Sequence, residues 1–168
     1  MSLFLIILAA GDNKRLKSKI PKPFHIINNK TLLEHSLQTF QDFKEIKKIL
    51  IVYNKKHKRY LSKLSLKNVI KIKGGKTRQE STFIALKKIK KMNCKKVLIH
   101  DSARPSPSKD LINKIIYNLK KNHAVVPVIK INDATKRVEK NVIFKNIQRN
   151  SLRFSQTPQG FTFRKIYE

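Results

Sequence analysis

The sequence is poor in cysteine, in long apolar segments and in acidic residues. Its single cysteine, Cys94, excludes a disulfide framework and a metal site built from cysteines. The longest apolar run covers only residues 3–10, which is too short for a transmembrane helix. This run lacks the basic residues that precede the apolar part of a signal peptide, and it leads into a charged loop. We therefore expect a cytoplasmic protein that does not bind a membrane.

The shortage of acidic residues gives the chain an extreme charge. Ten acidic residues stand against 39 basic ones, so the net charge is +29. Such a charge is typical of nucleic-acid binders. The lysines, however, are scattered over nearly every expected helix, and they form neither an arginine-rich stripe nor a pattern interleaved with aromatic residues. An AT-rich coding sequence would produce the same bias, so we expect small anionic substrates rather than a nucleic-acid partner.

The length and the apolar content indicate one domain. The chain has 168 residues, of which 40% are hydrophobic. That is enough for one domain with a substantial core and too little for two complete ones. Residues 1–168 are therefore expected to form a single domain.

The start of the chain predicts a strand followed by an anion-binding loop. Residues 3–8 are apolar without alternation, which is typical of a strand buried on both faces of a parallel sheet. Two alanines and Gly11 follow, where a ligand can approach the backbone closely. Arg15 and Lys22 come next, on a loop that contains two prolines. The segment suits a triphosphate, although a tight strand-to-loop turn alone would also explain the small residues.

Strands and helices are expected to alternate over the rest of the chain. Such an order predicts an α/β fold, Rossmann-like and doubly wound, with a mostly parallel sheet that is covered on both faces. Strands are expected at residues 3–8, 48–53, 69–72, 97–101 and 124–131. Helices are expected at residues 31–41, from 77 onward, at 109–121 and from 162 onward. A basic linker is expected at residues 55–64, and a β-ribbon at residues 138–144 with its turn near 139–141.

A glycine pair marks a second ligand-binding turn. Gly74 and Gly75 end a predicted strand, and Thr77 and Glu80 form a capping box that opens a helix whose Phe83 is expected to face the core. The exposed backbone N–H groups of such a turn can bind an anion or the polar edge of a ring, and the hydroxyl of Ser81 can point into the same crevice. An ordinary strand-to-helix turn is the alternative.

One of the ten carboxylates stands at the carboxyl end of an apolar strand. In open α/β sheets this edge binds ligands, and Mg²⁺ prefers carboxylate and phosphate oxygens. Asp101 is therefore the expected magnesium residue, with a helix cap or a partner of Arg104 as the alternative. The preceding His100 is expected to pack or to donate a hydrogen bond rather than to act as a base.

Together these segments resemble a known family. The spacing Ala-Ala-Gly-x3-Arg-x6-Lys resembles the signature of nucleotidyltransferases that activate sugars and phosphorylated alcohols. With GGKTRQES at residues 74–81 and VLIHDSARP at residues 97–105, the chain is similar to the 2-C-methyl-D-erythritol 4-phosphate cytidylyltransferase family over residues 3 to about 161. The chain departs from that pattern at Asn13, where the family has a glycine, and at Ala134, where it has a threonine.

The resemblance implies a reaction and a set of site residues. CTP would transfer CMP to methylerythritol phosphate, with Mg²⁺, in the non-mevalonate route of isoprenoid biosynthesis. Arg15, Lys22 and Arg149 would be catalytic. The nucleotide would be bound by Ala9, Ala10, Gly11, Asp12, Asn13, Gly75, Lys76, Ser81 and Ser102. The substrate would be bound by Asp101, Arg104, Thr135, Arg149 and Thr157, with Asp101 as the metal ligand.

The resemblance also implies an assembly. A β-arm over about residues 132–153 would clasp a second subunit and form a homodimer, in which Arg149 is supplied across the dimer. Family members continue for about another quarter of their length, so we expect a C-terminally incomplete domain, with a fusion to a further enzyme of the route as one explanation. The alternative functions are a cytidylyltransferase for ribitol 5-phosphate or a related polyol phosphate, and a non-catalytic binder of polyanions.

Overall fold

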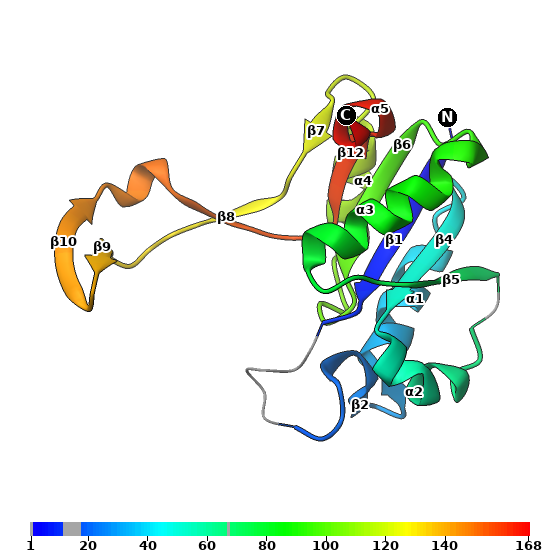
Figure 1. Ribbon diagram of the computed structural model, residues 1–168. Coiled ribbons are helices and arrows are strands. Elements are labelled where there is room, and N and C mark those ends of the chain that lie inside the picture. The colour runs from blue at the N-terminus through cyan, green and yellow to red at the C-terminus, as the bar shows by residue number, and fades with distance from the viewer. Residues whose placement is uncertain (1, 12–17, 67) are drawn as a thin grey trace.

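The strand β1 (Leu3–Ala9) lies in the middle of a six-stranded sheet in the computed structural model, which describes residues 2–11, 18–66 and 68–168 (Figure 1). The strand order is β5-β4-β1-β6-β12-β7. The first four strands of this order are mutually parallel, whereas β12 is antiparallel to β6 and to β7. The bounds are β4 (Ile46–Tyr53), β5 (Val69–Lys73), β6 (Lys96–Asp101), β7 (Ala124–Val125) and β12 (Gln159–Thr162). The expected mostly parallel sheet is confirmed.

The sheet has a topological switch point beside β1. The chain runs from β1 to β4 and then to β5 on one side, and it returns to the other side of β1 with β6. In the register of the parallel pair, Leu8 lies opposite Asp101, so the carboxyl ends of β1 and β6 are neighbours. Ligands of open α/β sheets bind in the crevice at such a point. The topology therefore places the end of the first strand and Asp101 at one crevice.

Helices cover both faces of the sheet. The helices α1 (Leu32–Gln41), α2 (Lys58–Ser62) and α4 (Lys109–Asn118) pack on the face that receives Leu3, Leu5 and Ile7. The helices α3 (Arg78–Ile89) and α5 (Phe163–Tyr167) pack on the other face with Phe4 and Ile6. Alternate side chains of β1 thus enter two separate cores, as a doubly wound fold requires. No helix in the described residues combines the length and the apolar composition that a membrane span needs.

The helix starts follow the expected caps in one case and depart from them in the other. At α1 the side chain of Thr31 accepts from the Glu34 N–H, and the Glu34 carboxylate accepts from the Thr31 N–H, which confirms the capping box. At α3 the side chain of Thr77 accepts from the Glu80 N–H at 3.0 Å, but the Glu80 carboxylate accepts from the Lys76 N–H instead. The prediction of a complete capping box at Thr77 was therefore wrong, because the Glu80 carboxylate does not accept from the Thr77 N–H.

Two expectations about helix faces and ends are corrected. Phe83 is 44% exposed and lies against Tyr167 rather than in the core, because Ala85, Leu86 and Ile89 supply the buried face of α3. The helix α4 ends at Asn118, three residues before the expected end, and a turn follows it.

The strand expected at residues 124–131 is divided between two sheets. β7 belongs to the central sheet, whereas β8 (Val128–Lys130) pairs with β11 (Arg153–Ser155) outside it. The break falls at Pro127, which has no N–H for the ladder and whose carbonyl accepts from the Gln156 N–H. The chain therefore leaves the body at Pro127 and returns at Gln156.

The segment between these points forms a long arm that projects from the body (Figure 1). Its outer part is a hairpin of β9 (Thr135–Glu139) and β10 (Val142–Ile147), followed by the 3-10 helix η4 (Arg149–Ser151). Lys140 and Asn141 form the turn with φ values of 47° and 64°, as a two-residue hairpin requires. The ribbon is longer than residues 138–144, because its first strand begins at Thr135.

The remaining short elements of the described residues are η1 (Lys22–Phe24), β2 (Ile26–Ile27), β3 (Lys30–Thr31), η2 (Lys55–His57) and η3 (Lys90–Met92).

Candidate functional site

A cleft of about 800 Å³ opens at the carboxyl ends of β1 and β6. The start of α3 and the loop that carries Lys22 form its other walls. Most of the residues expected to bind the nucleotide lie around it. The lining residues are Leu8, Ala10, Gly11, Lys22, Pro23, Gly75, Lys76, Thr77, Arg78, Ser81, Asp101, Ser102, Ala103 and Arg104.

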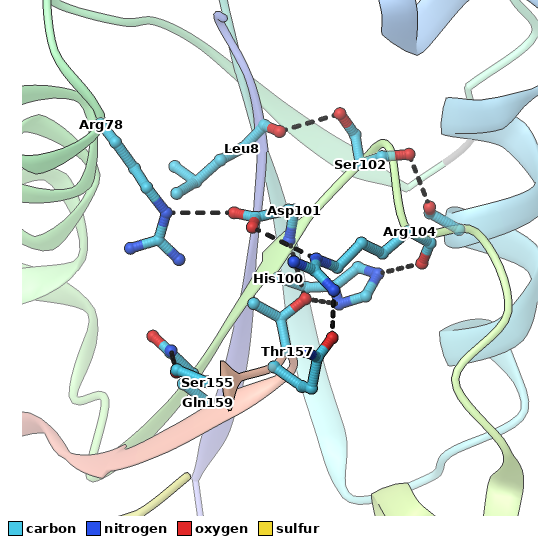
Figure 2. Close-up of polar contacts among 11 residues, drawn as sticks. Leu8, Arg78, His100, Asp101, Ser102, Arg104, Ser155, Thr157 and Gln159 are labelled. Atoms are coloured by element: carbon cyan, nitrogen blue, oxygen red, sulfur yellow. Dashed lines mark hydrogen bonds and ion pairs between the residues drawn. The ribbon is translucent and has the colours of Figure 1, made fainter. Parts of the chain in front are cut away.

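The floor of the cleft is held by Ser102. Its hydroxyl donates to the Leu8 carbonyl at 2.8 Å, and its backbone N–H donates to the same oxygen at 3.1 Å (Figure 2). The Ser36 hydroxyl of α1 donates to the Ser102 carbonyl at 3.0 Å. The Ser102 side chain is therefore buried and its proton is used inside the protein, so that toward a ligand it can offer only an acceptor oxygen.

The glycine pair brings the start of α3 close to the end of β1. The Gly74 N–H donates to the Tyr53 carbonyl at 2.8 Å, and the Gly75 N–H donates to the buried Ser81 hydroxyl at 3.1 Å. A Cβ on Gly74 would lie 2.8 Å from the Ala10 Cβ and 2.8 Å from the Ser81 Oγ. No side chain fits in this gap, so the close contact of the two turns depends on glycine at position 74.

The charges that line the cleft are unbalanced. Among the described residues that line it, four are cations, Lys22, Lys76, Arg78 and Arg104, and one is a carboxylate, Asp101. Arg78 Nε lies 3.1 Å from Asp101 Oδ1, and Arg104 Nε lies 3.8 Å from Asp101 Oδ2 (Figure 2). The cleft therefore carries an excess of positive charge, which attracts a polyanion such as a triphosphate.

Arg78 is a site residue that the sequence reasoning missed. It opens α3 directly after the cap residue Thr77, where a cation is unfavourable because the helix dipole is positive there. Its contact with Asp101 offsets that cost and directs the guanidinium into the cleft. The sequence contained a signal for this role, because a positively charged residue at the first position of a helix is unfavourable without a partner.

His100 lies behind the cleft and is fully buried. Its Nε2 is 2.9 Å from the Arg104 carbonyl, its Nδ1 is 3.0 Å from Thr157 Oγ1, and its ring meets the Phe40 ring edge-on at 4.9 Å. Burial lowers the pKa of His100 to about 4. The imidazole is therefore neutral near pH 7 and holds the turn after β6 in place, in agreement with the expectation that it packs and hydrogen-bonds.

Thr157 supports the cleft from within instead of lining it. Its hydroxyl oxygen accepts from the Asp101 N–H at 3.4 Å and contacts the His100 ring, and the side chain is buried (Figure 2). Arg104 contacts Gln156, the neighbour of Thr157, through its guanidinium. In the described residues Thr157 thus fixes the backbone of Asp101, and its contact with a substrate stays a prediction.

Two of the predicted site residues lie on the arm. Arg149 of η4 donates to the Asn132 carbonyl at 2.5 Å, and the Thr135 hydroxyl donates to the Asp133 carbonyl at 3.5 Å. Neither residue is among those that line the cleft. Within one chain the fold does not bring them to the cleft, and their roles stay predictions.

Three predicted residues, Asp12, Asn13 and Arg15, lie outside the described residues, and their roles stay predictions. Ala9 is the last residue of β1 and is buried beside the cleft. The described residues contain no cluster of three His, Cys, Asp or Glu side chains. A divalent cation would therefore rely on Asp101, which is partly exposed in the cleft, together with phosphate oxygens and water, and this donor set suits Mg²⁺.

Comparison with known proteins gives one family. Residues 3–168 match the family model described as "IspD: 2-C-methyl-D-erythritol 4-phosphate cytidylyltransferase". The chain is 45% identical over 168 residues to the bifunctional enzyme IspD/IspF of Pelagibacter ubique. This match covers 100% of this chain and 45% of that protein. It is 34% identical to the 2-C-methyl-D-erythritol 4-phosphate cytidylyltransferase of Clostridioides difficile, over 98% of this chain and 71% of that one.

A solved structure agrees with this assignment. The bifunctional IspDF of Campylobacter jejuni superposes with a TM-score of 0.85 at 31% sequence identity, over 99% of this chain and 42% of that one. The chain thus spans less than half of the bifunctional proteins that it matches.

Proposed function

Because the chain belongs to the 2-C-methyl-D-erythritol 4-phosphate cytidylyltransferase family, we propose that it transfers CMP from CTP to 2-C-methyl-D-erythritol 4-phosphate. The products would be 4-diphosphocytidyl-2-C-methyl-D-erythritol and pyrophosphate, in the non-mevalonate route to isoprenoids. The observation that carries the proposal is the cleft at the switch point, whose described lining residues include four cations and one carboxylate within the segments that resemble the family.

The proposed chemistry needs charge neutralisation more than proton transfer. A phosphate oxygen of the acceptor attacks the α-phosphorus of CTP, and the bond from that phosphorus to the bridging oxygen of the β-phosphate breaks as pyrophosphate leaves. The acceptor phosphate is already an anion near pH 7, so no general base is required. Lys22 lines the cleft and would stabilise the charge that develops at the α-phosphate, together with Arg15 by the family resemblance.

The wall formed by the end of β1 and the start of α3 would hold the nucleotide. Gly11 has open space where a Cβ would stand, so a ligand can approach its backbone, and Lys76 adds a cation at the start of α3. Ser81 lies in the same wall, with its hydroxyl against the Gly75 N–H. CTP would lie along this wall, with its triphosphate toward Lys22.

Asp101 would hold a magnesium ion next to the triphosphate. When bound, the ion would supply further neutralisation of the phosphate charges. Arg78 and Arg104 contact the carboxylate of Asp101 and keep it at the cleft, and their remaining guanidinium N–H groups can donate to phosphate oxygens.

The arm would complete the site of a second subunit. Its apolar side chains are exposed in the single chain, with Val142 at 67% and both Ile143 and Phe144 at 63%. Apolar groups at such exposure favour association with another surface. In a homodimer the arm would bring Arg149 and Thr135 of one copy to the acceptor half of the other cleft.

Three further inferences complete the proposal. Both proposed substrates are water-soluble phosphates, so we infer that the protein acts in the cytoplasm. The bifunctional relatives support a fusion of this domain to another enzyme of the route. The positive charge would serve these anionic substrates rather than a nucleic acid.

The direct test is product formation from defined substrates. The protein is incubated with CTP, Mg²⁺ and either methylerythritol phosphate or ribitol 5-phosphate, and ³¹P NMR follows pyrophosphate and the new diphosphate ester. We expect stoichiometric appearance of both signals with methylerythritol phosphate and slower turnover with ribitol 5-phosphate. Faster turnover with ribitol 5-phosphate would reassign the acceptor, and the absence of product with both would contradict the proposed reaction.

A further inference from the structure

The loop that carries Lys22 is anchored by its apolar residues. Pro21 and Pro23 are buried on either side of Lys22, whose own side chain is exposed. Phe24 is only 4% exposed and belongs to the core on the α1 face of the sheet. The 3-10 helix η1 closes with a hydrogen bond from the Phe24 N–H to the Pro21 carbonyl at 2.8 Å. The position of Lys22 over the cleft therefore follows the position of Phe24.

Phe24 is held from outside by α2. The Tyr60 ring stacks on the Phe24 ring with centroids 5.3 Å apart and planes inclined by 22°, and His57 meets the same ring edge-on at 6.1 Å. The next residue, Leu61, is buried in the same core cluster as Phe24. The short helix α2 thus connects the body, through Leu61, to the loop, through Tyr60.

Tyr60 makes two further contacts that fix its own position. The Arg59 guanidinium lies 4.9 Å from the centroid of the Tyr60 ring and donates to the Tyr60 hydroxyl at 3.1 Å. The Tyr60 hydroxyl donates to the Lys19 carbonyl, at the start of the loop, at 3.5 Å. Tyr60 therefore contacts the Lys22 loop at two points, three residues before Lys22 and two residues after it.

We propose that Tyr60 is a positioning residue for Lys22. The inference rests on the proposed function, in which the Lys22 ammonium stabilises charge that develops at the α-phosphate. A cation contributes fully to such stabilisation only when its backbone is held in place before the reaction. Tyr60 supplies this support without contacting the substrates, since it is not among the residues that line the cleft.

The first variant removes the stack and keeps an apolar side chain. Tyr60→Leu is expected to lower kcat about tenfold, because it removes the stack that holds the Lys22 loop and small displacements of a catalytic group are costly. KM for CTP is expected to change by less than about threefold, since the transition state depends on Lys22 more than the ground state does.

Matched variants separate positioning from general damage to the helix. Tyr60→Phe keeps the stack and is expected to retain kcat within about twofold. Ser62→Ala is the control on the same helix, because Ser62 is exposed and its hydroxyl donates to the Arg59 carbonyl within that helix. Phe24→Leu removes the same stack from the loop side, and it replaces Tyr60→Leu if that variant does not fold by circular dichroism.

The decisive measurement is a double-mutant cycle with Lys22→Ala. If Tyr60 acts through Lys22, Tyr60→Leu has no further effect on kcat once Lys22 is alanine. Full additivity of the two losses would overturn the inference and leave the proposed reaction standing. An unchanged kcat in Lys22→Ala alone would instead overturn the proposed role of Lys22, and the inference with it.

Discussion

The body and the arm use similar apolar residues in opposite ways. Leu5, Ile6 and Ile7 in β1 are completely buried between two layers of helices, whereas Val142, Ile143 and Phe144 in β10 stand more than half exposed. The central strand of the body therefore buries its apolar residues within one chain. The arm does not, and apolar groups at such exposure favour association with a second surface.

The two regions also divide the predicted site. The cleft of the body gathers Lys22, Asp101 and the glycine pair, which suits the nucleotide. Thr135 in β9 and Arg149 in η4 lie on the arm, which projects from the body (Figure 1), and neither lines that cleft. The comparison teaches that the described chain gathers most of the predicted nucleotide residues at one cleft, while the predicted acceptor residues of the arm lie outside it.

The largest expected effect is on the stability of the body. Leu98 in β6 is completely buried, and Leu98→Ala is expected to lower the free energy of unfolding by about 2–5 kcal/mol, because a cavity remains. The matched change in the arm, Ile143→Ala, is expected to lower the free energy of unfolding of the isolated chain by less than about 0.5 kcal/mol. Urea denaturation of both variants at low protein concentration measures the contrast, and equal losses would remove the distinction between the regions.

The second effect concerns the buried His100 of the body. Its pKa is lowered to about 4 from an ordinary value of 6.5, so the unfolded chain binds a proton that the folded chain does not. The resulting stability is complete above pH 6.5 and is lost as the pH falls toward 4, by roughly 3 kcal/mol in total. Urea denaturation across this range measures it, with His100→Gln, which cannot titrate, as the control. The same pH slope in both proteins would contradict the account.

The third effect is on catalysis in the cleft. Lys22→Ala is expected to lower kcat by about a hundredfold or more, the size of losing one preorganised charge contact. Lys47→Ala is the control, because Lys47 is an exposed lysine near the amino end of β4, away from the cleft. Pyrophosphate release gives both rates. Similar rates for the two variants would mean that the loop lysine acts only through the general charge of the protein.

The smallest effect sharpens the comparison by mixing subunits. Lys22→Ala and Arg149→Ala are each expected to be nearly inactive when pure. If Arg149 acts across a dimer, half of the randomly mixed dimers contain one intact site, so the mixture is expected to recover about a quarter of the normal activity. Size-exclusion chromatography with light scattering verifies the dimer. No recovery in a mixture of confirmed dimers would place Arg149 in the site of its own chain.

The sequence was sufficient for the parallel strands of the central sheet and for part of the site. Local rules of burial and capping predict the unalternating run in β1, the capping box at Thr31 and the carboxylate at the end of β6. No strand was expected at residues 159–162, where β12 pairs antiparallel to β6. The inward direction of the Thr157 side chain could not be predicted either, because it depends on a hydrogen bond with His100, which lies 57 residues earlier in the chain.

Other errors arose where a local signal competed with a stronger one. Pro127 ends the pairing of β7 with the central sheet, although the apolar run continues past it. The Glu80 carboxylate accepts from the Lys76 N–H rather than from the Thr77 N–H, because the turn at Gly74 and Gly75 places the Lys76 N–H 2.7 Å from it. Arg78 was overlooked because it reads as one more surface cation until Asp101 is placed beside it.

The most direct test of the account is nucleotide binding by the cleft. Isothermal titration calorimetry with CTP, UTP, ATP and GTP, at raised ionic strength and with Mg²⁺, separates specific binding from attraction of polyanions. The account predicts that CTP binds at least about tenfold more tightly than the other three, and that this ratio persists as salt rises. Equal, weak binding of all four that fades as salt rises would contradict it, and would show that the cleft attracts phosphate without recognising cytidine.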